Sequence, residues 1–195
     1  MKLATSILIA VGAAFSTGAF AADAGSAMQR DINQQQRIEQ GLQSGVLNTR
    51  EAATLERQQS HLNRLEANAL KDGALSDAEK RRIRGGQNKA SKSIYRQKHD
   101  AQTGNPNSAS SQRMQADVQR NINQEKRIGQ GLQSGELTNQ EAARLERGQA
   151  RITEAQARAG ADGHLGAHEQ RNIQKAENRQ SRRIFEQKHD AQKRP

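Results

Sequence analysis

The stretch QGLQSG at residues 40–45 recurs unchanged at residues 130–135. A shift of 90 residues aligns 30–102 with 120–192 without a gap, and 37 of the 73 aligned positions are identical. The frame EAAxLER, at 51–57 and 141–147, and the phrase QKHDAQ, at 97–102 and 187–192, belong to the same register. Self-similarity at one fixed spacing marks a duplicated structural unit.

The boundaries of the two copies follow from the composition between them. Residues 103–112 read TGNPNSASSQ, which is rich in the residue types that favour turns and loops. We therefore expect repeat 1 in residues 22–102, a flexible linker in 103–112 and repeat 2 in 113–195.

Each copy carries three helix signals. In residues 28–43, Met28, Ile32, Ile38 and Leu42 fall on one face of a helix, and Gly45 is placed to end it. A second helix is expected after Leu47 and a third after Leu75, because each start has a capping residue followed three positions later by Glu. The pairs are Asn48 with Glu51, Ser76 with Glu79, and Thr138 with Glu141 in the second copy.

The fold class predicted by these signals is all-α. No segment alternates apolar and polar residues as a half-buried strand does, so we expect two tandem, hairpin-like units of three helices each. Their core is thin, because only 23 of the 174 residues from Ala22 onward are Leu, Ile, Val or Phe. Each unit therefore needs the other copy, or a partner, to bury enough apolar surface.

The N-terminus has the pattern of an export signal. Lys2 precedes a short apolar run, and AFA at 19–21 is a small-x-small cleavage site, so we expect a signal peptide in residues 1–21. The expected location is the periplasm, with no later segment apolar enough to cross a membrane. The chain has no cysteine, so packing alone, or a ligand, must hold the fold.

The turn before each third helix resembles half of an EF-hand calcium loop. Asp72, Gly73, Leu75 and Glu79 match its fifth, sixth, eighth and twelfth positions, and Asp162 and Glu169 recur in repeat 2. The resemblance implies divalent-cation binding through Asp72, Glu79, Asp162 and Glu169. The first and third ligand positions hold Asn68 and Leu70, however, and helix capping accounts for the same residues without a metal. Residues 161–169 also resemble the acidic helix start of tellurite-resistance-B-like domains, which implies the same class of ligand.

The duplicated phrase QKHDAQ places a histidine at the end of each third helix. His99 and His189 are candidate transition-metal ligands, and the alternative is a ring that stabilises the negative end of a helix. In that second interpretation Ile94, Tyr95, Ile184 and Phe185 anchor the helix ends in the core. The chain shows no nucleophile motif, and we expect neither catalysis nor a cofactor.

Basic residues concentrate on the third helix of each copy. From Ala22 onward the formal charge is +9, which favours anionic partners. Export argues against nucleic acid, and the repeats contain only two aromatic residues for base stacking. We expect contact with anionic envelope polymers or with another envelope protein, and self-association is the other possibility. The candidate anion-binding residues are Arg81, Arg82, Arg84, Arg96, Arg171, Arg179, Arg182 and Arg183.

The combination of an export signal, RIxQGLQSGxL, EAAxLER, DGxL and QKHDAQ resembles a group of small, uncharacterised exported helical-repeat proteins of proteobacteria. The resemblance covers nearly all of the chain after residue 21, in two copies. It implies a Gram-negative periplasmic location and assigns no activity.

Overall fold

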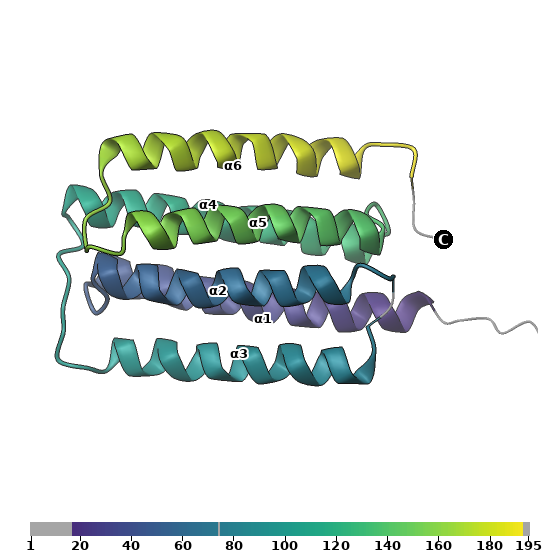
Figure 1. The fold of residues 1–195 in the computed structure, drawn as a ribbon, viewed down its shortest axis with the longest axis horizontal. Coiled ribbons are helices and arrows are strands. Elements are labelled where there is room, and N and C mark those ends of the chain that lie inside the picture. The colour runs from purple at the N-terminus through teal and green to yellow at the C-terminus, as the bar shows by residue number, and fades with distance from the viewer. Residues whose placement is uncertain (1–16, 74, 193–195) are drawn as a thin grey trace, which may run out of the picture.

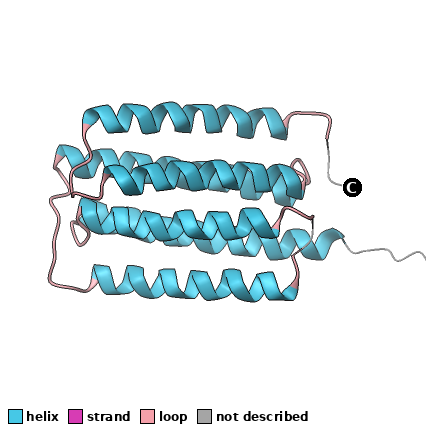
Figure 2. Cartoon of the chain, viewed as in Figure 1, coloured by secondary structure: helices cyan, strands magenta, loops and turns pink. Residues whose placement is uncertain are grey.

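The computed structural model describes residues 17–73 and 75–192, and this part of the chain contains six helices and no strand (Figures 1 and 2). The prediction of an all-α fold is confirmed. The helices are α1 (Thr17–Ser44), α2 (Thr49–Ala69), α3 (Asp77–Lys98), α4 (Ala109–Ser134), α5 (Asn139–Ala159) and α6 (Ala167–Lys188).

The helix ends form where the sequence places them. Asn48, Ser76 and Thr138 each accept a hydrogen bond from the backbone of the Glu three residues later, and that Glu accepts one from the cap's own N–H. Gly45, with φ of 75°, follows the last residue of α1, where a left-handed conformation is needed to turn the chain. These local contacts set where α2, α3 and α5 begin, and hence the lengths of the connecting turns.

The six helices lie in four layers (Figure 1). Helices α1 and α2 form one inner layer and α4 and α5 the other, with α3 packed outside the first and α6 outside the second. The most extensive contacts join α2 to α5 and α1 to α4, and each of these pairs runs antiparallel. The contact between repeats is therefore larger than the contacts within either one.

A pseudo-twofold axis relates the two repeats. Ser60 Oγ donates to the carbonyl oxygen of Ala150 at 2.8 Å, and Arg64 pairs with Glu154 at 3.4 Å. Each of these contacts joins a residue to the position 90 residues later, which is its own counterpart. A surface that meets its counterpart in this way is isologous, as in a symmetric dimer. The duplicated unit therefore packs against its own copy.

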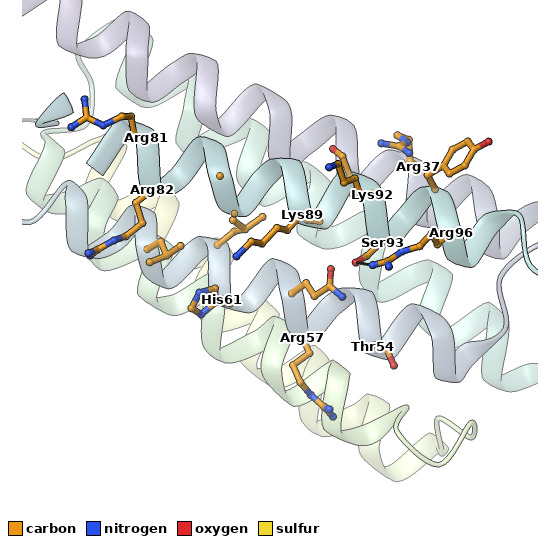
Figure 3. Close-up of a pocket in the computed structure, with 18 residues that line it drawn as sticks. Arg37, Thr54, Arg57, His61, Arg81, Arg82, Lys89, Lys92, Ser93 and Arg96 are labelled. Atoms are coloured by element: carbon orange, nitrogen blue, oxygen red, sulfur yellow. Dashed lines mark hydrogen bonds between the residues drawn. The ribbon is translucent and has the colours of Figure 1, made fainter. Parts of the chain in front are cut away.

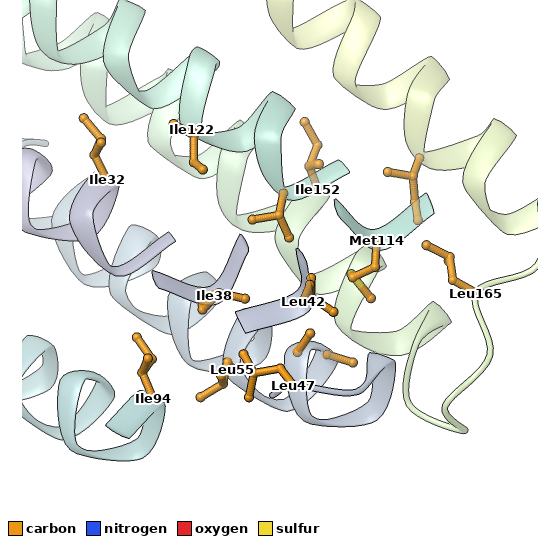
Figure 4. Packing of buried hydrophobic residues seen from close by; sticks show 14 residues of the cluster. Ile32, Ile38, Leu42, Leu47, Leu55, Ile94, Met114, Ile122, Ile152 and Leu165 are labelled. Atoms are coloured by element: carbon orange, nitrogen blue, oxygen red, sulfur yellow. The ribbon is translucent and has the colours of Figure 1, made fainter. Parts of the chain in front are cut away.

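Both hydrophobic clusters draw on both repeats. One contains Ile38, Leu42 and Leu55 from repeat 1 together with Met114 and Ile122 from repeat 2 (Figure 4). The other joins residues of α1 to residues of α4, α5 and α6. The expectation that a thin-cored unit packs against the other copy is met, because neither cluster is complete within one repeat.

The connection between the repeats is shorter and better anchored than the sequence indicated. Residues 109–112, which we expected in a flexible linker, form the first turn of α4, and Ser108 caps that helix. The N–H of Gly104 donates to the carbonyl oxygen of Gly45 at 2.8 Å. A Cβ at Gly104 would lie 2.6 Å from the Leu47 carbonyl oxygen, so the backbones approach closely there.

The prediction that Tyr95 and Phe185 anchor the core is wrong. They are 58% and 56% exposed, whereas Ile94 and Ile184 are fully buried. On α3 the buried positions are Ile83, Gln87, Ala90 and Ile94, and the residue after Ile94 points about 100° away from that face. Each aromatic ring instead stacks on the histidine four residues later, at a centroid distance of 4.1 Å.

Residues 1–16 of the predicted signal peptide lie outside the described residues. No helix within the described residues is long and apolar enough to cross a membrane.

Candidate anion-binding grooves

An open groove of about 1450 Å³ runs between α2 and α3, with Arg37 of α1 at its edge (Figure 3). We call it groove 1. Its α2 wall is formed by Thr54, Arg57, Gln58, His61 and Leu65, whose spacing of three or four residues places them on one face of the helix. Its α3 wall includes Arg81, Arg82, Gly85, Gly86, Lys89, Lys92, Tyr95 and Arg96.

The charge of groove 1 has one sign. Seven cationic side chains and His61 line it, and no carboxylate does; the cations are Arg37, Arg57, Arg81, Arg82, Lys89, Lys92 and Arg96. Within the described residues none of the seven forms a salt bridge. Arg96 donates only to Ser93 Oγ, at 3.4 Å. Uncompensated charges of one sign along a groove concentrate the field there and attract anions.

The bottom of groove 1 is apolar. Leu62 is buried, Leu65 is partly buried and Ala90 is buried. A Cβ at Gly86 would lie 2.7 Å from Leu62 Cδ2, so this glycine lets the leucine pack close to α3. A Cβ at Gly85 would meet nothing within 4 Å, which means that the space above this residue is open.

Helix α3 is held in place by two buried glutamines. Gln34 of α1 donates to the Gln87 carbonyl oxygen at 2.8 Å and to Ser91 Oγ at 2.9 Å. Gln87 in turn donates to Asp31 Oδ1 at 2.9 Å. Because α3 is attached to α1 through this face, its basic side remains free to form groove 1.

The equivalent site of repeat 2, groove 2, is smaller and less uniform in charge. It measures about 420 Å³ and is lined by Arg144, Leu145, Arg147, Arg151, Arg183, Glu186 and Gln187. Gln180, the counterpart of Ala90, is buried and donates to the Leu145 carbonyl oxygen at 2.8 Å. The side chain lies over Gly148, where a Cβ would overlap it.

The eight predicted arginines divide among several surfaces. Arg81, Arg82 and Arg96 line groove 1, and Arg183 lines groove 2. Arg84 lies on the other edge of α3, in a small pocket with Arg30 and Lys80. The remaining three, Arg171, Arg179 and Arg182, are exposed on α6 and line neither groove. Helices α3 and α6 lie on opposite sides of the molecule (Figure 1), so the arginines do not form one continuous patch.

The structure does not gather the predicted metal ligands. Asp72 and Asp162 are exposed, and Glu79 and Glu169 bind the backbone N–H of Ser76 and Gly166, both at 2.9 Å, as helix-capping residues do. His99 and His189 follow α3 and α6, which end at opposite ends of the molecule (Figure 1). The described residues contain no group of three His, Asp or Glu side chains that could hold a metal ion.

Sequence reasoning missed part of groove 1 and all of a second feature, a set of buried carboxyls. Arg57 and His61 of groove 1 lie on α2, and only the assignment of α2 and α3 as neighbours reveals their role. The second set comprises Asp31, Glu56, Glu66, Asp117, Glu125, Glu146 and Glu177, all of which are buried. Burial raises the pKa of Glu56, Asp117 and Glu146 to about 8, of Glu177 to about 7 and of Asp31 to about 6.

Two of these carboxyls, Glu56 and Glu125, accept hydrogen bonds from the other repeat. Glu56 Oε2 accepts from Gln35 at 3.3 Å and from Asn121 of repeat 2 at 3.4 Å. Glu125 Oε1 accepts from Asn63 at 3.2 Å, and burial together with neighbouring carboxyls raises its pKa well above the usual range. The hydrogen-bond partners of these carboxyls are mostly amides, which stabilise an ionised carboxylate less strongly than a cation would. A neutral carboxyl is therefore the form that this interior stabilises.

Comparison with protein-family models, with curated proteins and with solved structures found no match to the chain, so the assignment of a function rests on the geometry of the grooves.

Proposed function

We propose that the chain is an exported, non-enzymatic binding protein of the periplasm that holds an anionic component of the cell envelope. The observation that supports this most directly is groove 1, where seven cations without a carboxylate partner line one open surface. In an ordinary solvated surface, cations and carboxylates are interspersed. Because the cations of groove 1 have no carboxylates among them, they are available to attract an anionic ligand.

The spacing of the cations favours a ligand with more than one anionic group. Arg82 and Arg96 are separated by about 21 Å along α3 at the usual rise per residue, with Lys89 and Lys92 between them. A single small anion would contact one or two of these side chains. A phosphate-bearing or carboxylate-bearing envelope component would contact several.

Binding is favoured over catalysis by the kind of side chains that the groove presents. Its titratable residues are cations, one tyrosine and one histidine, and no carboxylate that could act as a general base or orient His61 lines it. Groove 2, with Arg144, Arg147, Arg151 and Arg183, would contribute a second and weaker anionic contact on α5 and α6.

Titration with inorganic polyphosphate, a polyanion without an apolar part, tests the proposal. The variant Arg57→Glu/Lys89→Glu should lower the affinity for polyphosphate at least tenfold. The control Lys71→Glu/Lys126→Glu, which has the same net charge, alters exposed residues outside both grooves and should change it less than twofold. Affinity of the native chain should fall steeply as salt rises.

Two outcomes contradict the proposal. One is equal loss of affinity in the groove variant and the control, because binding would then follow net charge alone. The other is polyphosphate affinity that does not change between low and high salt. Location is tested separately, by fractionating cells that express the chain with and without residues 1–21.

A further inference from the structure

From the differences between the two grooves we infer that groove 1 binds an anionic lipid, with the acyl chain on its apolar floor and the phosphate on its basic rim. This inference rests on the proposed function, because it names the class of anion held there. A hydrophilic polyanion would use the cations of the rim and would gain nothing from Leu62, Leu65 and Ala90 beneath them.

The duplicated fold does not require a groove as large as groove 1. Repeat 2 has the same architecture, and there a buried Gln180 stands at the position of Ala90 and donates to the Leu145 carbonyl oxygen. Gly148 makes room for that side chain, and Gln58 stands at its position in repeat 1. The open volume is about 420 Å³ in repeat 2 and about 1450 Å³ in repeat 1. The larger space is therefore a property of this repeat and not of the duplicated unit.

Helix α3 contains two adjacent glycines, Gly85 and Gly86, in its interior. Glycine in a helix interior is destabilising relative to alanine. Repeat 2 avoids both, with Lys175 and Ala176 at the equivalent positions. Gly86 has a packing role, because it admits Leu62. Gly85 has none in the described residues, since a Cβ there would meet open space, so what it contributes is the width of the groove.

The lining of groove 1 matches a ligand that is both apolar and charged. Ligand sites are lined mainly by apolar groups, with a few polar groups that fix orientation. In groove 1 the floor is apolar over its middle, and both helices contribute cations: Arg57 from α2, and Lys89, Lys92 and Arg96 from α3 (Figure 3). Tyr95, which is 58% exposed, adds an aromatic face at one end. An acylated phosphate satisfies both surfaces at once.

The test compares dodecyl phosphate, inorganic phosphate and dodecyl maltoside, each titrated below the concentration at which micelles form. Dodecyl phosphate should bind at one site per chain and at least tenfold more tightly than either of the other two. The variant Gln58→Gly/Ala90→Gln, which copies the residues of repeat 2, should lower the affinity for dodecyl phosphate at least tenfold. Its affinity for polyphosphate should fall by a smaller factor, because the cations of the rim are unchanged.

A second variant guards against misfolding of the first. Leu65→Ala copies Ala155 of repeat 2, removes part of the floor and introduces no charge. It should weaken dodecyl phosphate binding at least threefold and polyphosphate binding by a smaller factor, with a circular-dichroism spectrum like that of the native chain.

The outcomes separate this inference from the proposed function. If polyphosphate binds but dodecyl phosphate binds no more tightly than inorganic phosphate, the lipid assignment is wrong and the anion-binding proposal stands. If dodecyl maltoside binds as tightly as dodecyl phosphate, the charged rim has no role and the lipid assignment is again wrong. If neither polyphosphate nor dodecyl phosphate binds the native chain, both proposals fail.

Discussion

In the core of repeat 2, Asn121 Nδ2 donates to Gln156 Oε1 at 2.6 Å, and Gln156 in turn donates to Glu177 at 3.2 Å. The equivalent positions of repeat 1 hold Asp31 and Glu66, with Gln87 in place of Glu177. The number of carboxyls thus differs between two otherwise similar networks. Burial raises the pKa of both Asp31 and Glu66, and the carboxyls of Glu125 and Glu146 raise that of Glu66 further.

This arrangement predicts that the protein is more stable in mild acid than at pH 8. A carboxyl with a raised pKa in the folded state contributes stability that is complete below the unfolded-chain pKa, about 4. That stability is lost as pH rises through the folded-state values, here about 6 to 8. Thermal melts from pH 4.5 to 8.5 should show the melting temperature falling by about 2–4 °C for each kcal/mol lost. A melting temperature that rises over this range would contradict the prediction.

The matched variant Asp31→Asn/Glu66→Gln gives repeat 1 the amides of repeat 2. At pH 8 it should be more stable than the native chain, since two groups that resist ionisation have been replaced by neutral ones of similar shape. At pH 4.5 the two proteins should melt at similar temperatures. An equal change at both values would mean that the effect is steric and not electrostatic.

Near the end of α3, a buried residue, Ile94, stands next to an exposed one, Tyr95. Ile94→Ala removes a fully buried side chain and should cost about 2–5 kcal/mol. Tyr95→Ala removes a ring that is 58% exposed and should cost less than about 1 kcal/mol. Urea denaturation measures both. A Tyr95 variant as unstable as the Ile94 variant would show that the stack on His99 is a major contact.

Two glycines allow backbone strain to be separated from steric contact. Gly45 and Gly73 have φ of 75° and 89°, so alanine is strained at either position. A Cβ at Gly45 would also lie 2.9 Å from the Gly104 carbonyl oxygen, while one at Gly73 would meet nothing within 4 Å. Gly45→Ala should therefore lower stability by more than Gly73→Ala, in chemical denaturation of the two variants. Equal losses would mean that the connection at Gly104 adjusts without cost.

What the sequence predicted well was local. Helix starts at Asn48, Ser76 and Thr138 depend on contacts three residues apart, and the glycine that ends α1 depends on its own φ, so pattern alone identifies them. The prediction for Tyr95 failed because it depends on tertiary packing, which the local sequence pattern does not contain. Period alone permits either Ile94 or Tyr95 to face the core, and the position of α1 and α2 against α3 decides between them.

The parts of the site that sequence analysis missed are non-local. Arg57 and Arg82 line the same groove only because α2 and α3 pack side by side. The buried carboxyls are harder to foresee, because Glu56 and Glu146 lie in helices whose composition is typical of solvent-exposed faces. Their burial follows from packing between the repeats, and nothing in the sequence of a polar helix indicates which Glu will be buried.

The antiparallel pairing of α1 with α4 and of α2 with α5 also has a consequence for the covalent chain. If the large α2–α5 and α1–α4 contacts hold the halves together, the peptide between them supplies mainly effective concentration. A chain cleaved between Asn105 and Pro106 should remain a folded complex at micromolar concentration, and its separated fragments should reassociate when mixed. Dilution would then dissociate and unfold the cleaved protein but not the intact one. The difference between the two would measure how much the covalent connection adds to the stability of the same fold.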